Sequence, residues 1–379
     1  MKRYLLLLVS ALISVLLVCS CTYELRADGF ELVGNIEWEN ANDFSEGLAA
    51  VRKGGKWGFI NTDGEVVIDF LYDSVGQFSE GLCAVQTGYA WNYIDSTGRK
   101  VISGDFEAAN RFSEDRASVM VDYRYGVIDR SGNWVCAPQF DIVRPFRGGA
   151  AVVEISNFYS YVKADGTLMG DFKWGGASDF SEGLAEVFEE YKSGFIDING
   201  EYVLDLQFDD TMSFSEGLCA AMNSDRDWGY IDSTGEYVID PQWPEVESFS
   251  EGRAVVKKGT LYGYIGTKGE EVTNIRFQRA YGFSEGRAKI AVMGAAGLSF
   301  GYIDETGAYA VEPVYSEART FREGYAAVKN ISERWGYVDR NGETVIPMDF
   351  DEAFDFTEGI ARVRRGKKYG FIKITETEG

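Results

Sequence analysis

Two aromatic positions recur along the chain at a nearly constant spacing. A phenylalanine, which in most copies opens a Phe-Ser-Glu-Gly segment, stands at Phe44 and returns every 34 to 38 residues up to Phe356. Another aromatic residue lies six positions before each of these phenylalanines, from Trp38 to Phe350. A fixed period of this length is the signature of a repeat architecture. The pattern therefore predicts ten tandem units of about 34 residues over residues 38–373.

Short runs of β-branched and aromatic residues alternate with glycine turns inside each unit. Residues 228–231 and 237–239 flank a turn from Asp232 to Gly235, which is typical of a β-hairpin closed by a glycine at positive φ. The Asp232 carboxylate is placed to accept backbone N–H groups of that turn. The Phe-Ser-Glu-Gly segment is a second turn that leads into a third strand. No segment keeps a helical 3.6-residue apolar period, so the prediction is an all-β chain of short antiparallel hairpins.

A small residue stands five positions after each repeated phenylalanine. It is alanine in eight copies, and Cys83 and Cys219 fill the other two. One unit cannot bury its apolar face alone, so stacked neighbours must form the core, and this position indicates tight packing between them. Cys136 occupies an apolar strand position of its copy. These three cysteines are therefore interpreted as small buried hydrophobes and not as a disulfide framework or metal site.

An aromatic-glycine pair marks the second strand of most units. It is Trp57-Gly58 in the first copy, Trp228-Gly229 in the sixth and Trp335-Gly336 in the ninth, and other copies keep the glycine. At these residues the chain resembles the WG-repeat (KWG-repeat) family of bacterial proteins, over nearly all of residues 38–373. The resemblance implies a structural repeat module of exported and surface proteins. It implies no shared enzymatic activity.

The stacked units have two alternative arrangements. The chain finishes on residues 369–373, which look like the first strand of a hairpin, and residues 28–33 look like a second strand without a first. Such halves could complement each other and close a β-propeller-like ring. Ten units exceed the four to eight blades typical of propellers. We therefore predict an open superhelix or solenoid, with the closed ring as the alternative.

The first residues have the pattern of an export signal. Lys2 and Arg3 precede an apolar run over residues 4–18, which is too short to span a bilayer comfortably. The segment that ends at Cys21 resembles the lipobox of bacterial lipoproteins. We expect a signal peptide at 1–20, a lipidated Cys21 and cap strand at 21–37, and a C-terminal tail at 374–379. Thr22, in place of aspartate, favours the outer membrane or cell surface over the inner membrane of the envelope.

The net charge and the absence of histidine exclude several classes of function. The formal net charge of −23 argues against nucleic acid as a partner, because nucleic acids are bound through an excess of Lys and Arg. Histidine is absent, which excludes Ser-His-Asp and Cys-His nucleophilic sites and histidine-bound metals. We expect no enzyme and no cofactor, and any carboxylate-only activity is the weakest hypothesis.

Glutamate recurs in nine of the ten Phe-turns. One hypothesis is an acidic ladder that binds cations or a basic partner. The other, which the repetition favours, is that each carboxylate satisfies backbone donors in its own turn. The nine positions are Glu46, Glu80, Glu114, Glu182, Glu216, Glu251, Glu285, Glu323 and Glu358.

Irregular copies supply the candidate binding surface. Two aromatic rows, whose alternation is expected to place each on one strand face, either stack on glycans or belong to the shared core, which is the favoured alternative. They comprise Tyr89, Trp91 and Tyr93, and Phe158, Tyr159 and Tyr161. The fourth copy, with Arg147-Gly148-Gly149, and an insertion at 293–299 in the eighth are further candidates, since binding residues concentrate in loops. The predicted function is a non-catalytic, envelope-anchored scaffold for an unknown protein partner; the alternative is a carbohydrate- or cell-wall-binding lipoprotein.

Overall fold

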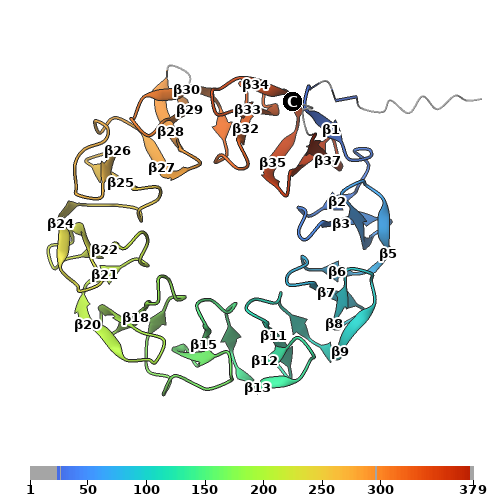
Figure 1. Cartoon of the computed structure of the whole chain (residues 1–379), viewed down its shortest axis with the longest axis horizontal. Coiled ribbons are helices and arrows are strands. Elements are labelled where there is room, and N and C mark those ends of the chain that lie inside the picture. Colours follow the sequence, from blue (N-terminus) through green and yellow to red (C-terminus); the bar gives the residue numbers. More distant parts are fainter. Residues whose placement is uncertain (1–23, 26, 295–296, 376–379) are drawn as a thin grey trace, which may run out of the picture.

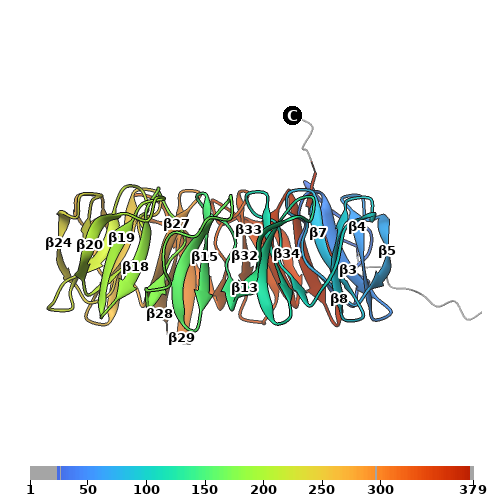
Figure 2. The same ribbon diagram turned by 90° about the horizontal axis from the view of Figure 1, so that it is seen from below.

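The repeated units fold into ten small β-sheets that stand side by side in a closed ring (Figure 1). The computed structural model describes residues 24, 25, 27–294 and 297–375, and the ten sheets are those of these residues. Seen from the side, the sheets form a single upright layer (Figure 2). The prediction of an all-β repeat fold is confirmed. The open superhelix is wrong, and the closed ring that was its alternative is the observed arrangement.

Each sheet is a blade whose strands run antiparallel from the central channel outward, and we number the blades by repeat. Blades 1 to 3 contain β2 (Asn40–Ala41), β3 (Leu48–Lys53), β4 (Lys56–Asn61) and β5 (Val66–Tyr72); β6 (Ser74–Val75), β7 (Leu82–Thr87), β8 (Ala90–Asp95) and β9 (Lys100–Phe106); and β10 (Ala108–Ala109), β11 (Arg116–Val121), β12 (Arg124–Asp129) and β13 (Trp134–Phe140). Blades 4 to 6 contain β14 (Ile142–Val143), β15 (Ala150–Ile155) and β16 (Phe158–Lys163); β17 (Gly176–Ala177), β18 (Ala185–Glu189), β19 (Lys192–Ile196) and β20 (Tyr202–Phe208); and β21 (Asp210–Thr211), β22 (Cys219–Met222), β23 (Trp228–Ile231) and β24 (Tyr237–Trp243).

The remaining blades continue the same order. Blades 7 to 9 contain β25 (Arg253–Lys258) and β26 (Leu261–Gly266); β27 (Arg279–Ser284), β28 (Arg287–Gly294), β29 (Gly297–Ile303) and β30 (Tyr309–Tyr315); and β31 (Glu317–Ala318), β32 (Tyr325–Lys329), β33 (Trp335–Asp339) and β34 (Thr344–Phe350). Blade 10 contains β35 (Glu352–Thr357), β36 (Ile360–Arg365), β37 (Lys368–Ile374) and β1 (Phe30–Leu32). Most blades have four strands and not the three expected, because the innermost strand is often only two residues long and leaves no sequence pattern.

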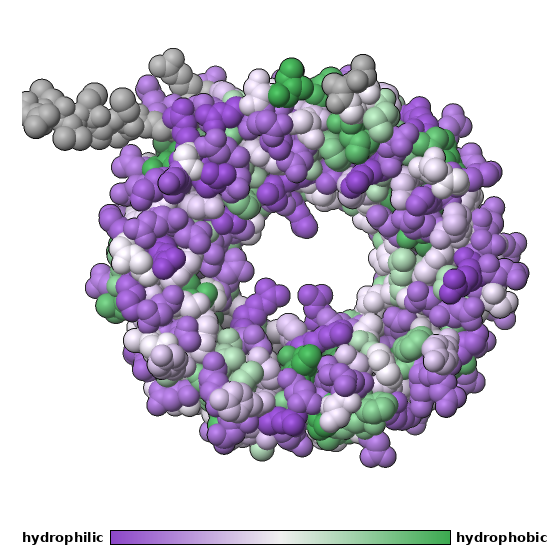
Figure 3. Space-filling model, turned by 180° about the vertical axis from the view of Figure 1, so that it is seen from behind, coloured by the Kyte–Doolittle hydropathy of each residue, from purple (hydrophilic) through white to green (hydrophobic). Residues whose placement is uncertain are grey.

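The two ends of the chain close the ring by sharing blade 10. Strand β1 pairs with β37 in antiparallel register, with Phe30 opposite Ile374 and Leu32 opposite Ile372. The complementary terminal halves are therefore confirmed as one sheet. The ring has more than the four to eight blades typical of propellers. It can do so because its centre is an open channel and need not be filled by side chains (Figure 3). Closure also leaves no blade face unpacked at an end of the stack, as an open superhelix would.

The glycine of each aromatic-glycine pair is explained by the strand that follows it. A Cβ atom on Gly229 would lie 2.5 Å from the Ile239 carbonyl oxygen, and one on Gly336 would lie 2.5 Å from that of Ile346. The register between β23 and β24 shifts at this point, so the outer strand presses its backbone against the glycine. Trp335 is buried, whereas Trp57 and Trp228 are half-buried. Gly58 has the same close approach, to Ile68.

Contacts between neighbouring blades make the core. The small-residue position is buried as predicted, and Cys83 and Cys219 are fully buried free thiols. Cys136 is also buried and free. In six blades a tyrosine of the third strand donates its hydroxyl proton to a backbone carbonyl of the next blade, as Tyr230 does to Glu247 at 2.7 Å and Tyr337 to Phe354 at 2.7 Å. This hydrogen bond therefore links six of the ten joints between the described blades.

No helix of membrane-spanning length and hydropathy occurs among the residues that the structure describes. The predicted signal peptide and Cys21 lie outside those residues. Export and lipidation therefore stay predictions.

Candidate functional site

The repeated glutamates occupy an unusual backbone conformation. In the turn from Ser250 to Arg253, these two residues exchange both backbone hydrogen bonds, at 2.8 and 3.2 Å. Glu251 has φ of 53° and Gly252 has φ of 75°, so the turn is of type I′. A non-glycine residue in this left-handed region costs about 1–2 kcal/mol. All nine glutamates share this positive φ, so a compensating interaction is expected at each of them.

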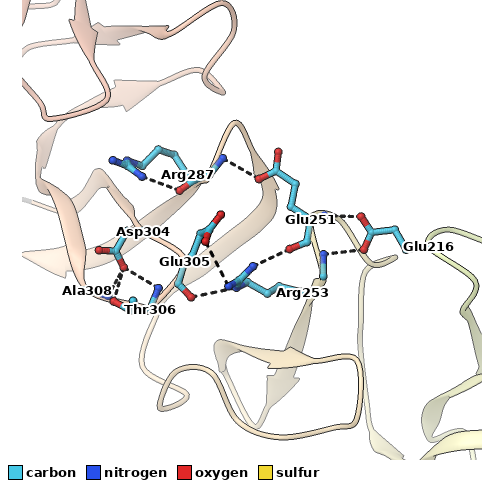
Figure 4. Close-up of polar contacts among 10 residues, drawn as sticks. Glu216, Glu251, Arg253, Arg287, Asp304, Glu305, Thr306 and Ala308 are labelled. Atoms are coloured by element: carbon cyan, nitrogen blue, oxygen red, sulfur yellow. Dashed lines mark hydrogen bonds and ion pairs between the residues drawn. The ribbon is translucent and has the colours of Figure 1, made fainter.

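That interaction is a hydrogen bond from one turn to the next around the ring (Figure 4). The Glu251 carboxylate accepts the backbone N–H groups of Glu285 at 2.6 Å and Gly286 at 2.8 Å. Glu216 does the same for Glu251 at 2.6 Å and Gly252 at 2.7 Å. Two successive left-handed residues point their N–H groups the same way and form an anion-binding nest. Each nest therefore holds the carboxylate of the preceding blade.

We call this series of turn-to-turn bonds the carboxylate relay. It closes the ring, because Glu358 accepts from the N–H groups of Glu46 at 2.7 Å and Gly47 at 2.9 Å. The other carboxylate-to-turn bonds run from Glu46 to Gly81, Glu80 to Asp115, Glu114 to Gly148 and Gly149, Glu182 to Glu216 and Gly217, Glu285 to Glu323 and Gly324, and Glu323 to Glu358 and Gly359. Nine of the ten joints between described blades carry such a bond; the fourth repeat has Gly148 where the others have glutamate.

The expectation that each glutamate bonds within its own turn is thus wrong in its geometry. The nest of a turn faces the preceding blade while its glutamate side chain extends to the following one, so the donors belong to the next repeat.

Other polar side chains add hydrogen bonds near these turns. Arg253 donates to the carbonyl oxygens of Glu251 at 2.7 Å and Glu305 at 3.1 Å. The Asp304 carboxylate accepts N–H groups of its own turn (Figure 4), as predicted for Asp232 in the sixth copy and found there too.

A mixed-charge cleft interrupts the regular inner rim between blades 8, 9 and 10. We define the mixed-charge cleft by Lys289, Arg319, Arg322 and Asp355. Its larger part has a volume of about 420 Å³ and is lined by Arg319, Arg322 and Asp355, and its smaller part adds Lys289 and Trp335. Asp43, Glu285, Glu317 and Glu323 also line the two parts. Asp43 and Glu317 pair with Arg362 and Lys329, and the other two carboxylates belong to the relay. Among the described residues, the three cations and Asp355 form no ion pair within 4.0 Å.

The charges of this cleft are only partly paired. Burial raises the pKa of the Asp355 carboxyl above its ordinary value, although Arg319 and Arg322 oppose the shift. Burial likewise lowers the pKa of the Lys289 ammonium, which lies 4.0 Å from the centre of the Tyr281 ring. Among the described residues, the buried Arg319 Nε and Asp355 Oδ1 have no hydrogen-bond partner. A buried polar group without a partner is costly, so this cleft can gain from a polar ligand.

The sequence analysis did not predict this cleft, although a difference between the copies marks it. Lys289 lies six residues after its repeated phenylalanine, where Ala50, Ala84 and Ala220 stand in other copies. Arg362 has the same position in the tenth copy, and it pairs with Asp43 at 2.8 Å. A cation at an alanine position of the blade interface marks a departure from the structural repeat.

The two predicted aromatic rows do not form continuous surfaces. Tyr93 and Tyr161 are fully buried between blades, and their hydroxyls donate to the carbonyl oxygens of Asn110 at 2.6 Å and Ser178 at 2.8 Å. For these two residues the structure agrees with the favoured alternative, the shared core, because blades cover both faces of a middle strand. Trp91 and Tyr159 are half-buried.

Only the residues nearest the hairpin tips reach solvent. Tyr89 is 97% exposed and Phe158 is 51% exposed. Tyr123 and Tyr191, which the sequence analysis did not single out, occupy corresponding tips and are 85% and 86% exposed. The tips of four consecutive blades, 2 to 5, therefore each present an aromatic ring, and we call Tyr89, Tyr123, Phe158 and Tyr191 the tip aromatics. The inserted hairpin of the eighth copy also exposes Met293, at 62%.

The part of the chain that the structure describes contains no group of three or more Cys, Asp or Glu side chains arranged to hold a metal ion. The relay carboxylates lie at the inner rim, each engaged with backbone donors. The nine glutamates therefore have a structural role, which is to link neighbouring blades.

Comparisons with known proteins identify the repeat family, whereas the similarity to solved structures is low. Among solved structures, the computationally designed Ika8 protein is 11% identical with a TM-score of 0.37, over 93% of this chain and 98% of that one. BamB from Moraxella catarrhalis is 9% identical with a TM-score of 0.37, over 92% and 99%, and the WD40 β-propeller domain of Doa1 is 11% identical with a TM-score of 0.29, over 62% and 92%. No curated protein matches the chain.

The WG containing repeat matches nine segments, which together make up well over half of the chain. They are residues 32–57, 57–91, 91–125, 125–157, 194–225, 228–260, 262–292, 300–330 and 335–369. The unmatched stretch between 157 and 194 holds the end of the fourth repeat, which lacks the aromatic-glycine pair. The chain therefore belongs to the family of proteins built from the WG containing repeat.

Proposed function

We propose that this protein is a non-catalytic scaffold for protein–protein interaction, held at the cell envelope by a lipid on Cys21. The observation that supports it is the mixed-charge cleft, where the repeat pattern gives way to Lys289, Arg319 and Arg322 around Asp355. The polar chemistry that the repeats share is engaged in holding the ring closed. The cleft is different: its charges are partly unpaired, and its cations suit the acidic side chains of a protein partner.

A site-specific photo-crosslinking experiment tests the proposal in the full-length protein in its native membrane. The crosslinking residue replaces Thr320, which lines the cleft, or Gln77, which has the same repeat position in the second copy. We expect a discrete crosslinked partner at Thr320 and none at Gln77. Lys289→Ala, which restores the residue of other copies, combined with Arg322→Ser is expected to abolish the adduct.

Two outcomes of this experiment count against the scaffold function at the cleft. One is the same crosslinked species at Thr320 and Gln77. The other is an adduct at Thr320 that survives the double variant. Fractionation of the Cys21→Ala protein tests the anchor separately, since the loss of the lipid should release the protein from membranes into the soluble extracellular or periplasmic fraction.

The tip aromatics favour carbohydrate or cell-wall binding as a second candidate function. Tyr123 and Tyr191 have φ of 60° and 68°, a strained conformation for an aromatic residue, and both rings are exposed. Neither feature helps the fold, and glycine takes the equivalent position at Gly55 of the first copy. Exposed aromatic rings on consecutive blades can stack on successive sugars.

Binding to an array of glycans and to isolated cell wall tests this second function. Tyr123→Gly and Tyr191→Gly relieve the backbone strain, so a loss of binding by the double variant would reflect the rings and not the fold. Ile331→Ser is the matched control, because Ile331 is 86% exposed on blade 9. Retained binding in the double variant would refute the glycan function.

A further inference from the structure

The fifth Phe-turn has a nest without a carboxylate. Glu182 and Gly183 have φ of 53° and 83°, close to the 58° and 78° of Glu216 and Gly217 in the next turn. The relay would supply a carboxylate from the fourth repeat, where Gly148 stands. Among the residues that the structure describes, no group accepts the N–H of Glu182 or of Gly183, and both residues are exposed. The anion-binding geometry is therefore formed and open to solvent.

We propose that this turn binds a carboxylate of another molecule, at the joint between blades 4 and 5. The other nests of the ring show what such a pair of N–H groups takes: at seven joints, a carboxylate bonds both donors at 2.6 to 3.0 Å. The site lies away from the mixed-charge cleft, so the two can be tested independently.

Two arginines lie at this joint. Arg147 replaces the serine whose hydroxyl, in seven other copies, donates to the Phe carbonyl oxygen of the next turn, as Ser181 does to Phe214 at 2.7 Å. Arg147 and Arg144 both pair with Asp179, at 3.5 and 3.9 Å. Two guanidinium groups thus share one carboxylate at this joint, while the Glu114 carboxylate is engaged by the N–H groups of Gly148 and Gly149. Charge and donor geometry thus point to the same class of ligand.

The backbone at this joint also explains why the fourth repeat does not fill the nest itself. A Cβ atom on Gly148 would lie 2.9 Å from the Cβ of Phe180. The turn of the fourth repeat therefore approaches the fifth too closely for a glutamate without a local shift. Gly148 has a positive φ of 61°, so it keeps the type I′ turn.

The carboxylate could belong to a small molecule or to an acidic side chain or C-terminus of a protein. Both sources share the chemistry that the nest recognises. Acetate and a short peptide with a free C-terminal glutamate serve as probes for the two sources. The amidated alanine version of that peptide, which has no carboxylate, is the control for nonspecific contact.

Titration of the full chain, labelled with ¹⁵N-glycine, tests the proposal by NMR. The Gly183 amide signal is assigned by its loss in Gly183→Asn, since asparagine tolerates a positive φ. We expect the signal to move downfield and saturate as acetate is added at constant ionic strength. The Gly217 and Gly252 signals, whose nests are filled from within, should stay nearly unchanged. A lower dissociation constant for the free peptide than for acetate would indicate a protein carboxylate as the ligand.

Two variants distinguish the contribution of the nest N–H groups to binding from that of the arginine charge. Arg147→Ser restores the residue of most copies and should weaken acetate binding by up to about fivefold, the effect of one exposed ion pair. Gly148→Glu should shift the Gly183 signal before any ligand is added and remove its response. If Gly148→Glu does not fold, the wild-type titration still decides: a Gly183 response no larger and no more saturable than that of Gly217 would overturn the proposal.

Discussion

The carboxylate relay makes a quantitative prediction at Glu251. Glu251→Ala removes the two bonds to the N–H groups of Glu285 and Gly286 and keeps the cost of the left-handed backbone. A hydrogen bond to a charged group contributes about 1.5–3 kcal/mol when buried. Glu251 is exposed, and water can replace its carboxylate at the donors. We therefore expect a loss of about 1–2 kcal/mol in the free energy of unfolding.

Glu251→Gly separates the carboxylate from the backbone strain. Glycine adopts φ of 53° without strain, as Gly148 shows in the fourth repeat, so this variant should be about 1 kcal/mol more stable than Glu251→Ala. Glu312→Ala is the control, because Glu312 is an exposed strand residue for which no hydrogen bond or ion pair is found in the described chain.

Urea unfolding followed by circular dichroism measures these differences, provided that the slope of the free energy against urea is unchanged. A value for Glu251→Ala that equals that of Glu312→Ala within about 0.5 kcal/mol would refute the relay as a source of stability. In that case the nine glutamates would need another explanation, such as the acidic ladder for a basic partner.

The other predictions use different parts of the repeat. Trp335→Ala should cost about 3–5 kcal/mol, as expected for a buried tryptophan, and Trp57→Ala less because Trp57 is half-buried; equal thermal shifts would contradict the burial. Gly229→Ala should cost about 1–3 kcal/mol from overpacking against the Ile239 carbonyl, whereas Gly76→Ala, whose Cβ would lie 3.6 Å from the Ala84 carbonyl oxygen, should be nearly neutral in the same melts. Burial acts to raise the pKa of the Glu285 carboxyl, but Arg340 and the N–H groups of Gly324 and Glu323 hold it below its ordinary value. The stabilisation by Glu285 should therefore be present above about pH 4.5 and decline as the pH falls below it, and unfolding curves of Glu285→Gln should show a smaller dependence on pH over that range.

The unit of this fold was predictable because its features repeat. The phased aromatics, the glycine turns and the Ala/Cys position each appear many times, so a local pattern could be separated from chance. Tyr89, Tyr93 and Phe158 show the limit of the same reasoning. Alternation assigns residues to strand faces, but it does not show that a second blade covers the outer face. Tyr93 is consequently in the core, and only the tip residues are exposed.

Closure of the ring depends on a quantity that sequence patterns do not contain. Each joint between blades turns the chain by an angle set by how the small residues, the tyrosine hydroxyl and the relay carboxylate pack, and small differences in that angle separate a ring from a spiral. The complementary ends were visible in the sequence, because residues 28–33 look like a second strand without a first and residues 369–373 look like a first strand without its second. They show that the ends can pair but not that they meet. The relay gives a reason why they do: the bond from Glu358 to Glu46 is the same as the bonds inside the ring, so the closing joint uses the geometry of every regular joint. The exception, at Gly148, is then a position where the ring can lose one internal ligand and leave its nest open to another molecule.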